Sequence, residues 1–169
     1  MKEQQITPCL WFNDNAEEAM QFYISVFKNS KAGKVSYYGE GAPLPKGTVL
    51  AANFELNGQE FMALNGGPHF TFSPAISFVI NCQTQGEIDD YWEKLSADSA
   101  HEQCGWLQDK FGVSWQVVPA ILGTLMGSPD QEKSARVMQA LLQMKKLVIA
   151  DLINAFENDE HQLIPDLQR

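Results

Sequence analysis

The sequence is poor in basic residues and has no long apolar segment. Lysine and arginine number 12 against 21 aspartates and glutamates, which gives a formal net charge of -9 at pH 7. Nucleic acids and anionic membrane surfaces attract basic proteins, so we expect neither as a partner. No apolar run approaches the roughly 18 residues of a membrane-spanning helix. The opening MKEQQITPCLWF lacks the apolar core of a secretory signal.

Cysteine is also scarce, whereas apolar residues are not. Cys9, Cys82 and Cys104 are an odd number and form no CxxC pair. Disulfides persist mainly in oxidising compartments, so we interpret the three as free thiols and expect a cytoplasmic protein. An apolar fraction of 44% over 169 residues is enough for one domain, or for two small modules that share a core.

The clearest structural signal is a hairpin within residues 48–80. Asn57-Gly58 separates two runs of alternating apolar residues, which is typical of a two-residue type I′ turn. This turn predicts the cross-strand pairs Leu56–Gln59, Phe54–Phe61 and Ala52–Ala63. One sheet face should then carry Ala52, Phe54, Phe61, Ala63 and Asn65. Gly66-Gly67-Pro68 should end the second strand, and a buried strand is expected at 75–80.

A strand-helix-strand pattern occurs twice. A strand at 6–12 is followed by an amphipathic helix that begins after Asn13-Asp14-Asn15, and a second helix follows the strand at 75–80. Glu87 follows Glu18 by 69 residues, as Tyr91 follows Phe22. We interpret this as an internal repeat of two modules.

A second hairpin and several helices should complete the chain. The hairpin is expected around residues 109–112, with Trp106 opposite Trp115 on one face and Gly105, Leu107, Ser114 and Gln116 on the pocket face. Ser128-Pro129-Asp130 predicts a helix start. Residues 158–169 read as a polar tail. Four apolar helix positions should become buried by a partner subunit in a homodimer: Val137, Leu141, Leu152 and Phe156.

Several segments resemble the PhnB-like proteins, a family often labelled 3-demethylubiquinone-9 3-methyltransferase. They are ITPCLWF, NAEEAMQFY, GQEFMALNGGPHFTF, AISFVINC, CGWLQDKFGVSWQVVP and RVMQALLQMKK. The resemblance runs from about Ile6 to Glu157. It implies the vicinal oxygen chelate (glyoxalase) superfamily and an α+β fold of paired βαβββ modules with additional C-terminal helices. The single domain 1–157 would hold module one at about 5–67, module two at about 74–118 and helices at about 119–157.

The superfamily's metal enzymes imply four ligand positions, which fall here on Pro8, Ala63, Ala75 and Gln116. Three of these offer no side-chain donor, and one amide oxygen cannot hold a metal alone. A register slip of one residue would bring in Cys9 or Leu64 instead of a histidine-carboxylate set. We therefore expect no metal and no other cofactor.

The same resemblance, with the predicted hairpins, suggests a pocket for a small-molecule ligand. Its expected lining is Phe12, Phe54, Phe61, Asn65, Ser77 and Gln116, with His69 and Phe70 at the rim. His69 is the best candidate for acid-base chemistry, although a loop histidine bonded to backbone is the alternative. Trp11, Trp92, Trp106 and Trp115 stack on a ligand or belong to the core. Cys104 is a nucleophile or a packed thiol.

Three functions stay open. The first is binding or transformation of a small, partly apolar molecule in a metal-free pocket. The second is the methyl transfer that the family label implies. Methyl transfer from S-adenosylmethionine usually needs a glycine-rich turn after a strand and before a helix, and Asn65-Gly66-Gly67 matches this motif weakly because no helix is expected after it. The third is a metal-dependent lyase or dioxygenase. The sequence identifies neither the ligand nor a reaction.

Overall fold

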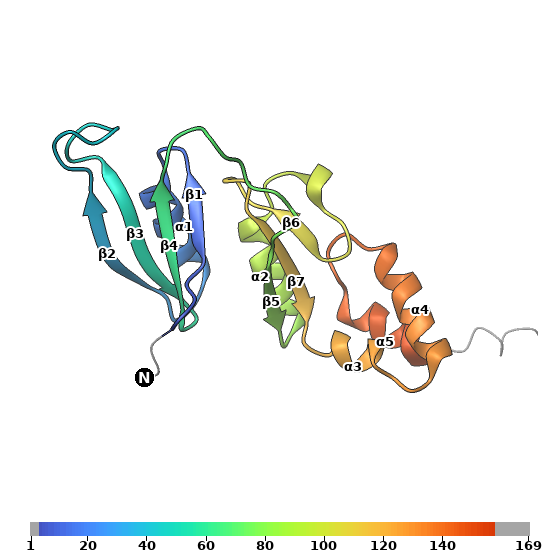
Figure 1. Ribbon diagram of the computed structural model, residues 1–169. Coiled ribbons are helices and arrows are strands. Elements are labelled where there is room, and N and C mark those ends of the chain that lie inside the picture. Colours follow the sequence, from blue (N-terminus) through green and yellow to red (C-terminus); the bar gives the residue numbers. More distant parts are fainter. Residues whose placement is uncertain (1–3, 158–169) are drawn as a thin grey trace, which may run out of the picture. The chain divides into compact units, whose positions relative to one another are not determined.

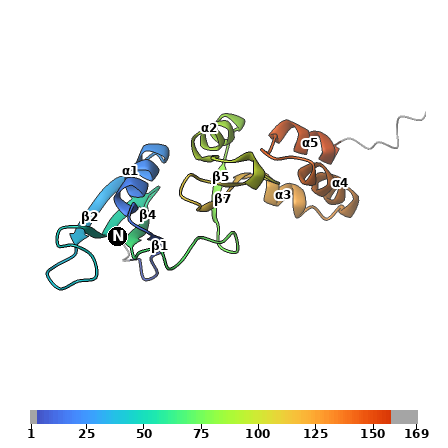
Figure 2. The ribbon, with the colours of Figure 1, turned by 90° about the horizontal axis from the view of Figure 1, so that it is seen from above.

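The computed structural model describes residues 4–157, and the expected tail at 158–169 lies outside them. The chain divides into two compact units, Met1–Ser73 and Pro74–Arg169. Each unit has a small sheet with a helix on one face, so the α+β class is confirmed (Figures 1 and 2). Within the described residues, no helix combines the length and the apolar character that a membrane crossing requires.

Unit one is a complete βαβββ module. It consists of β1 (Cys9–Phe12), α1 (Ala16–Val26), β2 (Lys31–Tyr37), β3 (Val49–Leu56) and β4 (Gln59–Asn65). The strand order is β1-β4-β3-β2, with β1 parallel to β4 and the other neighbours antiparallel. The predicted hairpin is confirmed: Leu56 pairs with Gln59, and both turn residues have positive φ, 48° at Asn57 and 82° at Gly58.

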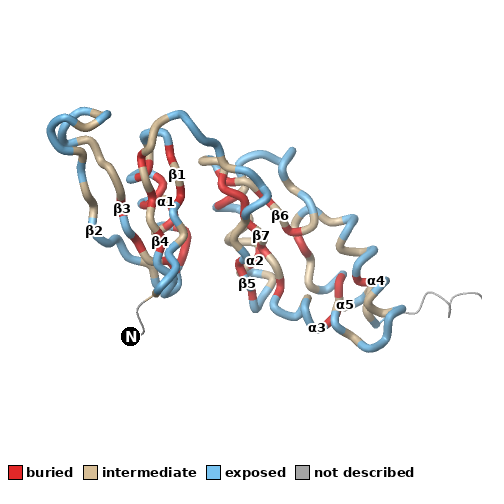
Figure 3. Tube along the Cα trace, in the orientation of Figure 1, coloured by how far each residue is buried: buried red, intermediate tan, exposed pale blue. Residues whose placement is uncertain are grey.

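The core of unit one lies between the sheet and α1. Buried positions of β3 and β4 alternate with half-buried or exposed ones, and α1 packs against both strands (Figure 3). The rings of Tyr23, Phe54 and Phe61 stack in sequence, with centroids 6.1 Å and 5.5 Å apart. Burial of each aromatic ring contributes about 2 kcal/mol. The face that carries Phe54, Phe61 and Asn65 is therefore the helix-packing face.

The side chain of Asn65 is the polar centre of this core, with 1% of its surface exposed. Its Oδ1 accepts a hydrogen bond from Ala16 N at 2.8 Å, and its Nδ2 donates to Val49 O at 3.0 Å. Asn15, which precedes α1, makes no side-chain cap. Asn65 therefore satisfies a backbone N–H at the start of α1 that has no partner within the helix.

Unit two repeats the plan with fewer strands. It contains β5 (Phe78–Cys82), α2 (Gln85–Leu95), a 3-10 turn at Ser99–His101, β6 (Trp106–Gln108) and β7 (Ser114–Pro119). The order is β5-β7-β6, and β5 runs parallel to β7. Helix α2 begins 69 residues after α1, as the repeat predicted. Residues 96–105, which are mostly polar, hold the 3-10 turn where a βαβββ module would place another strand.

The register of the second hairpin differs from the prediction by one residue. Leu107 pairs with Trp115, and Trp106 pairs with Gln116, so the expected Trp106–Trp115 pair is wrong. The cause is Asp109, a buried carboxylate that accepts hydrogen bonds from Phe111 N, Val113 N and Trp115 Nε1. It holds a five-residue turn, which places Leu107 and Trp115 in the core.

The C-terminal helices are α3 (Leu122–Met126), α4 (Gln131–Leu142) and α5 (Ile149–Glu157). Asp130 caps α4, accepting hydrogen bonds from Glu132 N and Lys133 N, so the predicted helix start is confirmed. The helices enclose their own buried cluster, Leu125, Val137, Leu147 and Leu152. Val137 and Leu152 are already 0% exposed in one chain. The expectation that these two lose exposure to a partner is therefore wrong.

Replacement of Asn65 tests its structural role. We expect Asn65→Ala to lower the free energy of unfolding by about 2–3 kcal/mol, because it leaves Ala16 N–H and Val49 C=O buried without partners. Asn53→Ala, on the exposed side of β3, should change it by less than about 0.5 kcal/mol. Urea unfolding measures both. Equal effects of the two substitutions would contradict the assignment.

Candidate ligand site

The open face of unit one is the side of its sheet away from α1. Strand register arranges its residues in three rows, each crossing the strands. The first row is Trp11, Leu64, Ala51 and Ser36; the second is Cys9, Met62 and Asn53; the third is Glu60, Glu55 and Lys31. The first row is half-buried, and exposure is greater in the other two. The face therefore changes from mainly apolar to charged along the strands.

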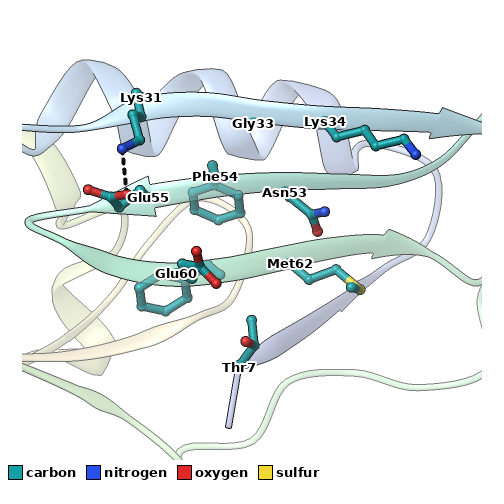
Figure 4. A pocket seen from close by; sticks show the side chains of 10 residues that line it. Thr7, Lys31, Gly33, Lys34, Asn53, Phe54, Glu55, Glu60 and Met62 are labelled. Atoms are coloured by element: carbon teal, nitrogen blue, oxygen red, sulfur yellow. Dashed lines mark ion pairs between the residues drawn. The ribbon is translucent and has the colours of Figure 1, made fainter. Parts of the chain in front are cut away.

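A cleft of about 360 Å³ includes the third row and, from the second row, Met62 and Asn53 (Figure 4). Its lining is Thr7, Lys31, Gly33, Lys34, Asn53, Phe54, Glu55, Glu60, Phe61 and Met62. Lys31 Nζ lies 2.7 Å from Glu55 Oε2. The Glu55 carboxylate, and more weakly that of Glu60, raises the pKa of the Lys31 ammonium. The volume lies near the lower end of the roughly 300–1,000 Å³ of small-molecule pockets.

A bulge in β2 shapes one wall of this cleft. Ala32 pairs with Phe54 and Val35 with Ala52, so Gly33 and Lys34 together lie opposite Asn53. A Cβ on Gly33 would come within 2.8 Å of the Asn53 carbonyl oxygen. Only glycine allows this approach without a backbone shift. The bulge thereby adds Lys34 to the cleft, as bulges commonly redirect a side chain.

A tight corner stands at the other end of the open face. Trp11 Nε1 donates a hydrogen bond to Gly67 O at 2.9 Å. A Cβ on Gly66 would lie 2.1 Å from the Trp11 ring, so this position requires glycine. Phe70, 68% exposed, contacts Trp11 edge to face with centroids 5.0 Å apart. No helix follows Gly66-Gly67 before β5, so the turn serves Trp11 and does not form a strand-turn-helix nucleotide loop.

The structure separates the predicted site residues into three groups. Phe12, Phe54, Phe61 and Asn65 belong to the core under α1, and Phe54 and Phe61 are also among the residues that border the cleft from their strands. His69 and Phe70 are exposed in the loop after β4. Ser77 and Gln116 lie in unit two, where Gln116 Nε2 donates to Ser77 Oγ at 2.9 Å. Their contacts with a ligand stay a prediction.

The sequence predicted Phe54 and Phe61 but not the polar residues that line the cleft. Lys34, Asn53 and Glu60 were not singled out, although the alternation that placed Phe54 and Phe61 together also places Asn53 and Glu60 on the opposite face. The signal that could have identified them is that Asn53 and Glu60 are polar and that a glycine, Gly33, lies on the neighbouring strand. Which face a helix covers was the missing information.

The superfamily's metal does not fit the residues present. Ala63 lies fully buried under α1, and Pro8 and Ala75 have no donor. Gln116 is engaged with Ser77. No group of three histidine, cysteine, aspartate or glutamate side chains with ligand geometry occurs among residues 4–157. The expectation of a metal-free protein stays a prediction.

The cysteines differ in environment. Burial, followed by the nearby Glu87 carboxylate, raises the pKa of Cys82 to about 11, so its thiol is protonated at neutral pH. Partial desolvation also raises the pKa of Cys9, although this residue is exposed. Cys104 is half-buried in a left-handed turn, and Gln103 Nε2 lies 3.4 Å from its sulfur. The choice between nucleophile and packed thiol stays open for Cys104.

Each of the two units combines strands, a helix and a hairpin, and in each the helix covers one face of the sheet, which is an α+β architecture. A family model described as 3-demethylubiquinone-9 3-methyltransferase matches residues 4–118. The chain belongs to this family, as the resemblance implied. The match ends at Val118, so α3–α5 lie beyond it, although the resemblance was expected to reach Glu157.

Solved structures agree with this assignment. A putative 3-demethylubiquinone-9 3-methyltransferase, PhnB protein, from Bacillus cereus is 43% identical with a TM-score of 0.62, over 69% of this chain and 100% of that one. A protein from Pseudomonas aeruginosa shares the fold at 22% identity and a TM-score of 0.53, over 69% of this chain and 98% of that one. The comparison with curated proteins gives no match.

The Gly66–Trp11 contact leads to a prediction. Gly66→Ala should displace the indole ring and destabilise the fold by about 2 kcal/mol, because the added methyl group overpacks the corner. As a matched control, a Cβ on Gly86 in α2 would meet only Thr84 Oγ1 at 3.9 Å, an ordinary contact, so Gly86→Ala should stabilise by about 0.5–1 kcal/mol. Urea unfolding followed by tryptophan fluorescence measures both. A neutral Gly66→Ala variant would show that the corner is not constrained.

Proposed function

We propose that the chain binds a small, partly apolar organic molecule on the open face of unit one, without a metal. The observation that carries the proposal is the change along this face from the apolar row of Trp11, Leu64 and Ala51 to the polar cleft. An apolar group on the first row would be removed from water, while polar groups fix its orientation in the cleft. Phe70 and His69 would border the apolar end.

Methyl transfer is the less favoured alternative. The family description and the name of the Bacillus cereus relative suggest it. The glycine pair that prompted the comparison with S-adenosylmethionine loops is accounted for by the packing of Trp11.

If the bound molecule undergoes a proton transfer, His69 is the group we propose for it, because it lies in the loop that carries Phe70.

A ligand screen tests this function. Indole and phenol should raise the melting temperature, because binding at about 100 times Kd stabilises the native state by roughly 2.7 kcal/mol. S-adenosylmethionine, Mn²⁺ and Zn²⁺ should leave it unchanged. Leu64→Ser should weaken indole binding about tenfold, whereas Ile121→Ser, at an exposed position before α3, should not. Stabilisation by S-adenosylmethionine or a metal, and by neither aromatic, would refute the proposal.

We also propose a cytoplasmic homodimer. Its support is the exposed apolar surface of α4, where Met138 is 40% and Leu142 52% exposed. The three free cysteines fit a reducing compartment.

Sedimentation velocity tests the dimer. We expect a dimer at micromolar concentration, and a monomer for Leu142→Glu, because a buried charge at an interface is strongly unfavourable. Glu132→Gln, at an exposed position of α4, is the control and should stay dimeric. A wild-type monomer would contradict the proposal.

A further inference from the structure

The cleft of unit one contains polar side chains that the fold does not use. Lys31 and Glu55 form an ion pair with each other. Among the described residues, none forms a hydrogen bond or ion pair with the side chains of Lys34, Asn53 or Glu60. The cleft therefore has a cation, an amide and a carboxylate available to a ligand.

These groups are separated along the sheet. Figure 4 shows Lys34, Asn53 and Met62 toward one end of the cleft, and Glu60 with the Lys31–Glu55 pair toward the other. Met62, which pairs with Asn53, follows Glu60 by two residues on β4, so the two ends of the cleft are next-but-one positions on the same sheet face. Flexible lysine and glutamate side chains at neighbouring positions can both reach one compact molecule that has two polar groups.

The charges decide which polar groups fit. Two lysines and two glutamates line the cleft, so its charge is balanced. A simple anion at Lys34 would lie near the negative Glu60, and a simple cation at Glu60 would lie near the positive Lys34. A molecule that carries both charges in opposite order meets an opposite charge at each end, and the Lys31 ammonium near Glu60 is already paired with Glu55.

The apolar part of the ligand has a defined place as well. The apolar row begins two residues beyond the second row, at Leu64 on β4 and Trp11 on β1. A side chain attached to the charged group can therefore extend along the strands from Met62 onto Leu64 and Trp11. The arrangement matches the shape of an amino acid with an apolar side chain.

From this juxtaposition we infer that the cleft binds the zwitterionic head group of a small apolar amino acid or a molecule of the same charge pattern. The carboxylate binds Lys34 and Asn53, the ammonium group binds Glu60, and the apolar side chain lies on Met62, Leu64 and Trp11. This inference rests on the proposed function, because it specifies the polar end of the same ligand.

Isothermal titration of the full chain with four matched probes tests the inference. L-phenylalanine carries both charges, 3-phenylpropionate only the carboxylate, phenethylamine only the ammonium group, and 2-phenylethanol neither. We expect L-phenylalanine to bind about fivefold more tightly than either singly charged probe, a ratio typical of one exposed ion pair. Raised ionic strength should reduce this preference.

Two variants separate the ends of the cleft. Lys34→Met should weaken the binding of L-phenylalanine and 3-phenylpropionate about fivefold and leave the binding of phenethylamine unchanged. Glu60→Gln should weaken the binding of L-phenylalanine and phenethylamine, whereas 3-phenylpropionate should bind at least as tightly as before. Two control variants remove the same charges elsewhere, Lys46→Met in the β2–β3 loop and Glu17→Gln on α1. Neither should change the affinity for any of the four probes.

The outcomes distinguish this inference from the proposed function. Equal binding of 2-phenylethanol and L-phenylalanine would overturn the zwitterion and leave the binding of an apolar molecule intact. Displacement of L-phenylalanine by inorganic phosphate, with tighter phosphate binding in Glu60→Gln, would show an anion site instead. Variants that weaken all four probes alike would show a structural role for Lys34 and Glu60. If none of the four probes binds, the inference is overturned. The screen with indole and phenol then decides separately whether the proposed function holds.

Discussion

The arrangement of unit one depends on the buried amide of Asn65. It joins the last residue of β4 to the first residue of α1 and to the first residue of β3. Its backbone carbonyl also accepts a hydrogen bond from Tyr38 OH at 2.8 Å. Because a buried amide must be paired, these bonds keep α1 on one sheet face. The opposite face is thereby left without a helix of the same unit.

Asp109 has the corresponding role in unit two. Its carboxylate joins two backbone N–H groups of the turn to the indole N–H of Trp115. A shift of one residue in the hairpin would move Trp115 from the core to the other face. The same bonds therefore place Gln116 beside Ser77, away from the core. In both units one buried polar side chain selects the face that carries the core.

The open face of unit one acquires its character from this selection and from glycine. Since α1 covers the aromatic set, the alternate set of Met62, Asn53 and Glu60 remains accessible. Gly33 permits the bulge that brings Lys34 into the cleft, and Gly66 permits Trp11 to pack at the apolar end. Neither glycine lies in the covered face, yet together they define both ends of the proposed site.

Three features follow from local chemistry and were predictable from the sequence. Asn57-Gly58 set the first hairpin register, Asp130 set the start of α4, and the offset of 69 residues placed α2 relative to α1. The tertiary structure alone decided which side of the first sheet α1 covers and how Asp109 shifts the second hairpin. The reason is physical: alternation of period two identifies two faces, but long-range packing and buried hydrogen bonds choose between them. The sequence therefore predicted which aromatic residues share a face. That this face lies in the core, and that the opposite face holds a polar cleft, became evident only from the folded chain.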